Sequence, residues 1–203
     1  MMLNSETRPA NVERRELLLA VARRVFAERG FTATTMDDIA RAAGFTKPIL
    51  YQYFDSKTDL YREIVSQTAA RLLSQLDVAV HTTQSPRARI EVAFRVYFEM
   101  VVSEPDAFRI LFIHAHEGET AAELRNLELG LVSFIEPYIT VEISEDHRRQ
   151  LAAGVVGIAE GTAVAWLVQR RDAASSSTAD EAARLAARAA TLAWGGLRAV
   201  TQD

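Results

Sequence analysis

Cysteine is absent from this chain of 203 residues. Its absence excludes disulfide bonds and thiolate metal ligands, and it agrees with a reducing cytoplasm. Residues 1–9 also lack the apolar core that a secretory signal peptide requires. We therefore expect a cytoplasmic protein with a frayed tail over residues 1–11.

Lysine occurs at only two positions, Lys47 and Lys57, and both fall within residues 34–57. Arginine supplies the other basic side chains apart from histidine. A lysine at these two places indicates that a compact, flexible cation is needed there. Compositional bias in the coding sequence, with two lysines surviving by chance, is the alternative explanation.

Positive charge is scarce overall, and the formal net charge is −4 at pH 7. Residues 1–62 contain 10 basic and 8 acidic side chains, whereas the remaining residues contain 13 basic and 19 acidic ones. A mildly basic N-terminal module on an acidic body favours contact with a polyanion at one end only.

Alternation of apolar and polar residues, which marks strands, is missing from the sequence. Apolar residues recur at helical spacing instead, and 49% hydrophobic residues are enough to bury a core. The sequence therefore predicts an all-α fold. A first helix of about five turns should follow Asn11 as its N-cap and stop at Gly30. Later helices are expected over residues 36–43, 47–53, 57–80, 87–103, 106–115, 120–140, 145–171 and 180–200.

Two helix starts have the same cap pattern. Thr35 precedes Asp38 by three positions and Ser56 precedes Asp59 by three, which satisfies free backbone N–H groups at a helix start. Between them, Gly44 suits a left-handed turn. A supporting helix, a turn with glycine and a second short helix are the parts of a helix-turn-helix, which places its second helix in the major groove of DNA.

Outward side chains of the second short helix have the chemistry that duplex DNA requires. Lys47 can donate to guanine, Ile49 can contact a thymine methyl group and Gln52 can pair with adenine. Hydroxyl groups, and cations at helix starts, suit phosphates. The residues predicted to face double-stranded DNA are Thr35, Thr46, Lys47, Ile49, Tyr51, Gln52, Tyr53 and Lys57. The alternative is a structural hairpin whose solvated face carries these residues.

One pattern of spacings extends from Ala22 to Lys57. Its members are Ala22, Phe26, Gly30, Phe31, Thr35, Ile39, Ala40, Ala43, Gly44, Lys47, Pro48, Leu50, Tyr51, Phe54 and Lys57. Because it has these residues at these spacings, the segment 12–62 resembles the DNA-binding region of the TetR family of bacterial transcriptional regulators. Tyr53 replaces the family's more usual histidine and Phe45 replaces a smaller aliphatic residue, and both departures bear on the operator sequence.

The resemblance implies an all-helical homodimer. Residues 12–56 would form the helix-turn-helix DNA-binding domain, and residues 57–203 would form the effector-binding and dimerisation domain. Aromatic residues cluster in that second part, and in this family such residues often line a ligand cavity. The predicted ligand-binding residues are Phe94, Tyr97, Phe98, Phe108, Phe112, Phe134 and Trp166. An ordinary helical core explains each of them equally well when it is taken singly.

Residues 151–168 are largely apolar and about long enough to span a membrane. Glu160 in the middle, three glycines and the lack of a second such segment favour a helix buried in protein contacts instead. The glycines lie on one face and allow another helix to approach closely. The predicted dimer interface consists of Gly154, Gly157, Gly161 and Trp194, together with the helix at 180–200.

Enzyme motifs such as a nucleophile elbow, a phosphate loop or a zinc-hydrolase signature are missing from the sequence. His114, His116 and Glu117 suggest metal binding or acid–base chemistry, and the alternative is a cluster at a helix end that contacts solvent or ligand. Side chains at positions i and i+2 of a helix diverge by about 200°, so the two histidines do not converge on one ion. We expect no metal, no cofactor and no enzymatic activity.

A second resemblance concerns the effector. Residues 47–52, 108–112 and 193–197 are similar to an actinobacterial branch of the family that includes regulators of fatty-acid synthesis responding to long-chain acyl-CoA. This implies a small apolar effector, with an aromatic or cationic drug-like molecule as the second choice. The expected function is a ligand-responsive repressor released from a pseudo-palindromic operator. The alternatives are a transcriptional activator of lipid-metabolism genes with the same fold, and a helical ligand carrier or enzyme whose N-terminal hairpin does not bind DNA.

Overall fold

The computed structural model describes residues 7–113, 121–170 and 179–200, and these residues form helices without any strand. The all-α prediction is therefore confirmed for this part of the chain. The helices are α1 (Thr7–Ala33), α2 (Met36–Ala42), α3 (Lys47–Tyr51), α4 (Lys57–Val80), α5 (Pro86–Ser103), α6 (Pro105–Phe112), α7 (Ala121–Ile135), the 3₁₀ helix η2 (Glu136–Tyr138), α8 (Glu145–Gln169) and α9 (Ala179–Leu197).

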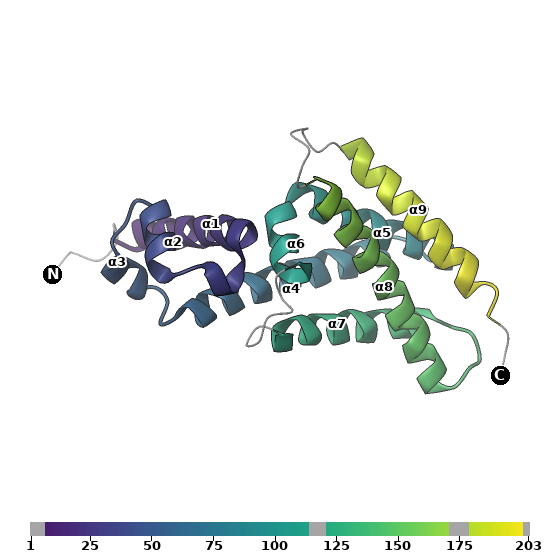
Figure 1. The fold of residues 1–203 in the computed structure, drawn as a ribbon. Helices are drawn as coiled ribbons and strands as arrows, with labels where there is room; N and C mark the ends of the chain where they lie inside the picture. Colours follow the sequence, from purple (N-terminus) through teal and green to yellow (C-terminus); the bar gives the residue numbers. More distant parts are fainter. Residues whose placement is uncertain (1–6, 114–120, 171–178, 201–203) are drawn as a thin grey trace.

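A module of α1, α2 and α3 lies at one end of the molecule, and α4 runs from it into a larger helical body (Figure 1). Phe26 and Phe31 of α1 pack edge-on against Tyr61 of α4, with ring centroids 5.4 and 5.1 Å apart. Leu50 of α3 is fully buried in the same core. The first turns of α4 thus belong to the core of the N-terminal module as well as to the body.

The body is built around α5, which packs against α4 and α9, while α7 and α8 pack against each other. Glu104, between α5 and α6, joins the body to the module. Its carboxylate accepts hydrogen bonds from Arg23 of α1 at 3.3 Å and from Arg71 of α4 at 2.6 Å. Since α6 also packs on α1, the two parts of the molecule share a polar and an apolar contact.

The start of α1 differs from the prediction. Because α1 begins at Thr7, Asn11 lies inside the helix and is not its N-cap. Pro9 falls in the first turn, where its missing N–H group is tolerated, so the helix can start earlier than the apolar pattern indicates. The predicted stop is present: Gly30 has φ 78° and ψ 168°, which breaks the helix before a last turn that ends at Ala33.

The helix predicted over residues 120–140 is too long. In the structure α7 ends at Ile135, and a 3₁₀ turn follows over Glu136–Tyr138. Pro137 lies at the start of that turn and has no backbone N–H group to donate, so the α-helical hydrogen-bond pattern cannot continue through it.

Helix α8 is long and apolar enough to cross a membrane, judged by length and composition alone. One such helix is weak evidence for a membrane protein. One side of α8 is buried within the body through Ala152, Val156, Ala163 and Leu167. Glu160 also lies within α8, where a charged side chain would be unfavourable inside a lipid bilayer.

Candidate functional site

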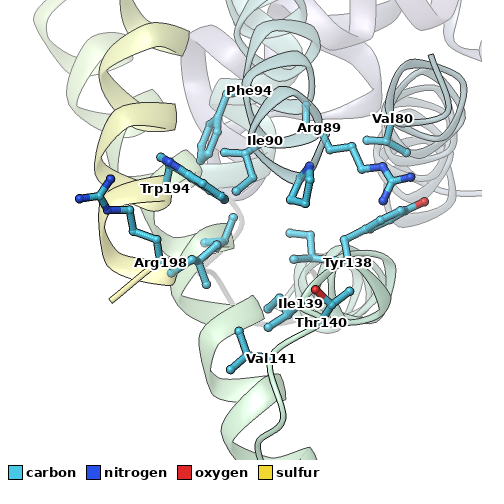
Figure 2. Close-up of a pocket in the computed structure, with 15 residues that line it drawn as sticks. Val80, Arg89, Ile90, Phe94, Tyr138, Ile139, Thr140, Val141, Trp194 and Arg198 are labelled. Atoms are coloured by element: carbon cyan, nitrogen blue, oxygen red, sulfur yellow. The ribbon is translucent and has the colours of Figure 1, made fainter. Parts of the chain in front are cut away.

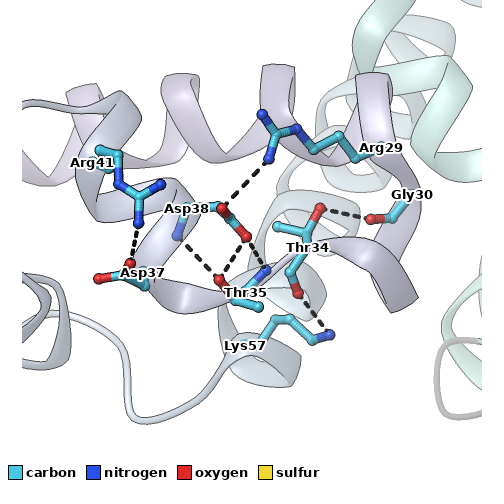
Figure 3. A network of polar contacts seen from close by, with 8 residues as sticks. All are labelled: Arg29, Gly30, Thr34, Thr35, Asp37, Asp38, Arg41 and Lys57. Atoms are coloured by element: carbon cyan, nitrogen blue, oxygen red, sulfur yellow. Dashed lines mark hydrogen bonds and ion pairs between the residues drawn. The ribbon is translucent and has the colours of Figure 1, made fainter.

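The supporting helix α2 starts with a complete capping box. Thr35 Oγ1 accepts a hydrogen bond from the backbone of Asp38 at 3.1 Å, and Asp38 Oδ2 accepts one from the backbone of Thr35 at 3.0 Å (Figure 3). The Thr35 hydroxyl also donates to Asp38 Oδ2 at 2.6 Å. These bonds from Thr35, followed by the charges of Arg29 and Arg41, lower the pKa of the Asp38 carboxyl. The predicted cap is therefore present.

The turn between α2 and α3 depends on glycine. Gly44 has φ 74°, the left-handed region that side chains with a Cβ rarely adopt. This conformation lets the next N–H group, that of Phe45, return to the carbonyl of Ala40 at 2.9 Å. Thr46 then occupies the N-cap of α3 without a side-chain cap hydrogen bond, and it is exposed. Its hydroxyl is therefore available to a phosphate.

Helix α3 presents a polar, exposed side. Lys47, Tyr51 and Gln52 are exposed, Ile49 is half-buried and Leu50 faces the core. The ammonium of Lys47 lies 5.9 Å from the ring centroid of Tyr51, so these two side chains share one stretch of surface. Lys47, Tyr51 and Gln52 were predicted to point outward, and their exposure agrees with that prediction. Their contact with DNA stays a prediction.

Tyr53 differs from the other side chains of this group. It is half-buried, and its hydroxyl donates a hydrogen bond to Oδ1 of Asn11 on α1. The residue that was expected to cap α1 thus holds the side chain that was expected to reach a phosphate. Arg14, one helical turn further along α1, stacks over Phe45 with its guanidinium carbon 5.6 Å from the ring centroid. The sequence did not show that Arg14 lies beside the turn, because only the fold brings α1 next to Phe45.

Lys57 is held by the end of α1. Its ammonium donates to the carbonyl of Phe31 at 2.8 Å and to that of Thr34 at 2.9 Å (Figure 3 shows the second bond), and it lies 4.2 Å from the Phe31 ring centroid. A cation at carbonyls that a helix end leaves open is stabilised by the helix dipole. An ammonium has three N–H groups. Two of them bond to these carbonyls and so fix the start of α4 against the end of α1.

A cavity of about 250 Å³ lies at the far end of the body, between α5, η2, α8 and α9. Figure 2 shows Ile90 and Phe94 of α5 facing Trp194 of α9 across it. Val80, the last residue of α4, also lines it. Apart from two arginines, the residues that line this cavity are largely apolar. An apolar cavity of roughly 150 Å³ is already large enough to bind benzene.

Arg89 and Arg198 line this cavity on opposite sides, and in Figure 2 their guanidinium groups point away from its centre. Arg89 donates to the carbonyl of Thr83 at 3.1 Å and stacks over Tyr138, 5.4 Å from its ring centroid. Arg198 is exposed. The cavity therefore combines an apolar interior with positive charge at its edge.

A second cavity of about 50 Å³ adjoins the first, and Phe94 and Ile135 line both. Tyr97 and Glu160 lie in its wall. Burial raises the pKa of Tyr97, and the charge of Glu160 adds to this effect. Burial, and then the charge of Glu128, raise the pKa of Glu160 to about 7.

The predicted aromatic residues divide between cavity and core. Phe94, Tyr97 and Phe134 line one or both of these cavities. Four others line neither of them and are buried in the core: Phe98, Phe108, Phe112 and Trp166. The reason is that helical spacing places a side chain on the inner face without showing whether space is left beside it.

Trp166 was predicted for the ligand cavity and Trp194 for the dimer interface, and the structure shows what each of them contacts within the chain. Trp166 donates from Nε1 to Glu181 at 2.8 Å, and Arg170 contacts the same carboxylate at 2.6 Å, so Trp166 joins α8 to α9. Trp194, predicted for the dimer interface, lines the larger cavity. Its apolar ring lies on the inner side of α9, facing α5.

The glycine face of α8 is open. Gly154, Gly157 and Gly161 are exposed, and a Cβ added at any of them would meet no atom within 4 Å. Val168 of α8 and Leu192 of α9 are 55% and 65% exposed. No part of the described chain covers these glycines, so their small size serves no close contact among the described residues.

Metal-binding clusters of three or more ligating side chains do not occur among residues 7–113, 121–170 and 179–200. His114, His116 and Glu117 lie outside the described residues.

Comparison with known proteins agrees with this geometry. The family model described as bacterial regulatory proteins of the tetR family matches residues 18–64. The HTH-type transcriptional activator FasR of Mycolicibacterium smegmatis is 32% identical over 189 residues, which cover 91% of this chain and 83% of FasR. The HTH-type transcriptional repressor KstR2 of Rhodococcus jostii is 36% identical over 97 residues, 48% of each chain.

A solved structure extends the comparison to the whole fold. FadR from Bacillus subtilis, solved in complex with stearoyl-CoA, has a TM-score of 0.76 to this structure at 13% sequence identity. The match covers 89% of this chain and 98% of that one. At this identity the likeness concerns the fold, and it includes the body as well as the N-terminal module.

Proposed function

Because this chain belongs to the TetR family and is a ligand-responsive, DNA-binding transcriptional regulator, we propose that it binds a pseudo-palindromic operator as a homodimer and releases it when an elongated apolar effector fills its cavity. The observation that carries this proposal is the course of α4. This helix begins at Lys57 beside the helix-turn-helix and ends at Val80 in the cavity wall.

The operator contact is assigned to the exposed side of the helix-turn-helix. Lys47 and Gln52 are the candidates for base contacts in the major groove, with Ile49 beside them. The phosphate contacts are assigned to Thr35, Thr46, Tyr51, Tyr53 and Lys57. The single hydroxyl protons of Thr35 and Tyr53 are donated to Asp38 and Asn11, so each hydroxyl would have to change partner to donate to a phosphate. Lys57 has a third N–H group beyond its two carbonyl bonds and can offer it without losing them.

The homodimer is assigned to the open faces of α8 and α9. Gly157 and its neighbouring glycines allow a second α8 to approach closely, and Leu192 offers exposed apolar surface on α9. A two-fold axis at this place sets the two copies of α3 at a fixed separation. Two-fold symmetric proteins bind operators with matching half-sites, which is why the operator should be pseudo-palindromic.

The effector class follows from the cavity. Its interior suits an alkyl or acyl chain, and Arg89 and Arg198 suit an anionic head group. A long-chain acyl-CoA has both parts, and stearoyl-CoA is the ligand in the FadR structure from Bacillus subtilis. A drug-like aromatic molecule is the second choice, because it fits the apolar walls and leaves the arginines unused.

Release of DNA requires unequal affinity of the effector for two conformations. A chain in the cavity would displace Val80 and shift α4, which the Lys57 ammonium ties to the end of α1. The separation of the two α3 helices in the dimer would then change, and one half-site would lose its fit. Repression relieved by ligand is the proposed outcome.

Activation is the second candidate, and one observation favours it: FasR, whose match covers 91% of this chain, is a transcriptional activator. The two candidates share the fold, the operator contact and the cavity. Transcription from the bound promoter, measured with and without the protein, distinguishes them.

The test begins with selection of genomic fragments by the purified protein. We expect enrichment of one pseudo-palindromic sequence, with binding that weakens steeply as salt rises, since phosphate contacts release counterions. Native mass spectrometry of the freshly purified protein should then show two chains and a bound apolar molecule. Failure to enrich any sequence at moderate salt would rule out operator binding and favour a ligand carrier with a structural hairpin.

A further inference from the structure

Two polar atoms in the wall of the smaller cavity lack partners. The hydroxyl of Tyr97 on α5 and Oε1 of Glu160 on α8 are both buried, and neither has a hydrogen-bond partner among the described residues. Tyr97 is 4% exposed. Buried polar atoms in folded proteins are almost always paired, so two unpaired ones in the wall of one cavity point to a partner outside the chain.

The place of these atoms gives the orientation of that partner. Phe94 and Ile135 line both cavities, and Arg89 borders the larger one. An elongated molecule with its head near Arg89 would pass the shared apolar walls and reach the smaller cavity with its far end. The far end would then meet the only two polar side chains among the described residues that line this smaller cavity.

From this arrangement we propose that Tyr97 and Glu160 form a polar anchor that binds a hydroxyl group at the far end of an otherwise apolar effector. The proposal rests on the effector cavity proposed above and specifies the ligand chemistry at its inner end. A hydroxyl both donates and accepts, so it can donate to Glu160 and accept from Tyr97 at the same time. A terminal carboxylate would place a second negative charge beside Glu160.

The surroundings of Glu160 support a neutral partner. Burial raises the pKa of Glu160, and the charge of Glu128 of α7 adds to this effect. Arg125 of α7 lies with both carboxyl groups in a neighbouring surface groove. The carboxyl is thus partly protonated near neutral pH, and both of its forms can bond to a hydroxyl. A ligand that pairs these two groups satisfies atoms that have no partner among the described residues, so the anchor should discriminate strongly between matched ligands.

The experiment compares 12-hydroxydodecanoic acid with dodecanoic acid, using calorimetric titration of the full-length protein. Tyr97→Phe, which removes one hydroxyl and keeps the ring, should weaken binding of the hydroxy acid about tenfold and leave that of dodecanoic acid unchanged. Glu160→Leu should act in the same direction. Tyr61→Phe removes a buried tyrosine hydroxyl outside both cavities and is the matched control.

Equal loss of both acids in Tyr97→Phe, or no loss of either, would overturn the anchor. If neither acid binds the unaltered protein, the assignment of an anionic head group to the effector is wrong. The titration is then repeated with 1-decanol, which is uncharged and does not depend on an arginine. Weaker binding of 1-decanol to Tyr97→Phe would then uphold the anchor. Unchanged binding of 1-decanol, or none to either protein, would overturn it.

Discussion

Tyr61 of α4 donates a hydrogen bond from its hydroxyl to the carbonyl of Ile110 in α6, at 3.0 Å, and both residues are fully buried. The same ring packs edge-on against Phe26 and Phe31 of α1. One side chain thus joins the helix that leaves the DNA-binding module to a helix of the body. The junction between the two parts is a packed core with a satisfied polar contact.

Tyr61→Phe should lower the free energy of unfolding by about 1 kcal/mol, because the ring packing is kept and one buried hydrogen bond is lost. Urea unfolding followed by circular dichroism measures the change. Tyr51→Phe removes the hydroxyl of a tyrosine that is 44% exposed and should leave the stability unaltered. Equal effects of the two substitutions would show that the bond to Ile110 contributes nothing.

The two lysines should differ in what they do. Lys57→Ala removes an ammonium that donates to two carbonyls, so it should lower the free energy of unfolding by about 2 kcal/mol and weaken binding to every duplex. Lys47→Ala removes an exposed side chain, so it should leave stability unchanged and alter base preference at one operator position. Chemical unfolding and selection from a randomised operator library measure these effects.

Equal loss on all duplexes for Lys47→Ala would remove its assignment to base contacts. For Lys57, a variant with unaltered stability would show that its carbonyl contacts are unimportant in solution. Lys57→Arg is an informative companion, because arginine keeps the charge and changes the geometry of the donors.

The glycine face of α8 should determine the oligomeric state. Gly157→Leu adds a side chain into open space within one protomer, so the fold should persist while the dimer dissociates. Sedimentation velocity should show the molecular mass halved, and operator affinity should fall because one α3 helix is lost from the complex. Ala70→Leu places the same side chain on an exposed part of α4 and is the control. A dimeric Gly157→Leu protein would place the interface elsewhere.

The features that sequence predicted well are local. Thr35 and Asp38 are three residues apart, and their capping box depends only on that spacing and on the backbone between them. Gly44 likewise meets a requirement of the turn in which it lies. Such elements need no knowledge of the rest of the fold, so the helix-turn-helix could be predicted closely.

The features that sequence could not foresee depend on contacts between distant segments. Trp194 and Trp166 both follow helical spacing, and only the packing of α9 on α5 and α8 puts one in a cavity wall and the other in the core. Lys57 has the spacing of a phosphate contact, yet two carbonyls 26 and 23 residues earlier in the chain take up two of its donors. Asn11 was assigned to a helix start, whereas its partner is 42 residues away.

Stability should depend on pH through Glu160. Its pKa is raised to about 7 in the folded protein, from 4.5 in the unfolded chain, by burial first and by Glu128 second. Between these values the folded state binds more protons than the unfolded state, so stability falls as pH rises from 4.5 to about 7 and then levels off.

Glu160→Gln removes the titrating group and should flatten this part of the profile, with a gain in stability at pH 8. Tyr97 faces the same carboxyl and stays neutral across this range, because burial raises its pKa. Glu128→Gln should lower the pH at which the fall occurs, since it removes the like charge and leaves burial in place. Unfolding free energies from urea titrations at pH 5, 6, 7 and 8 measure all three proteins, and identical profiles for Glu160→Gln and the unaltered chain would show that this carboxyl is ionised in the fold at an ordinary pH.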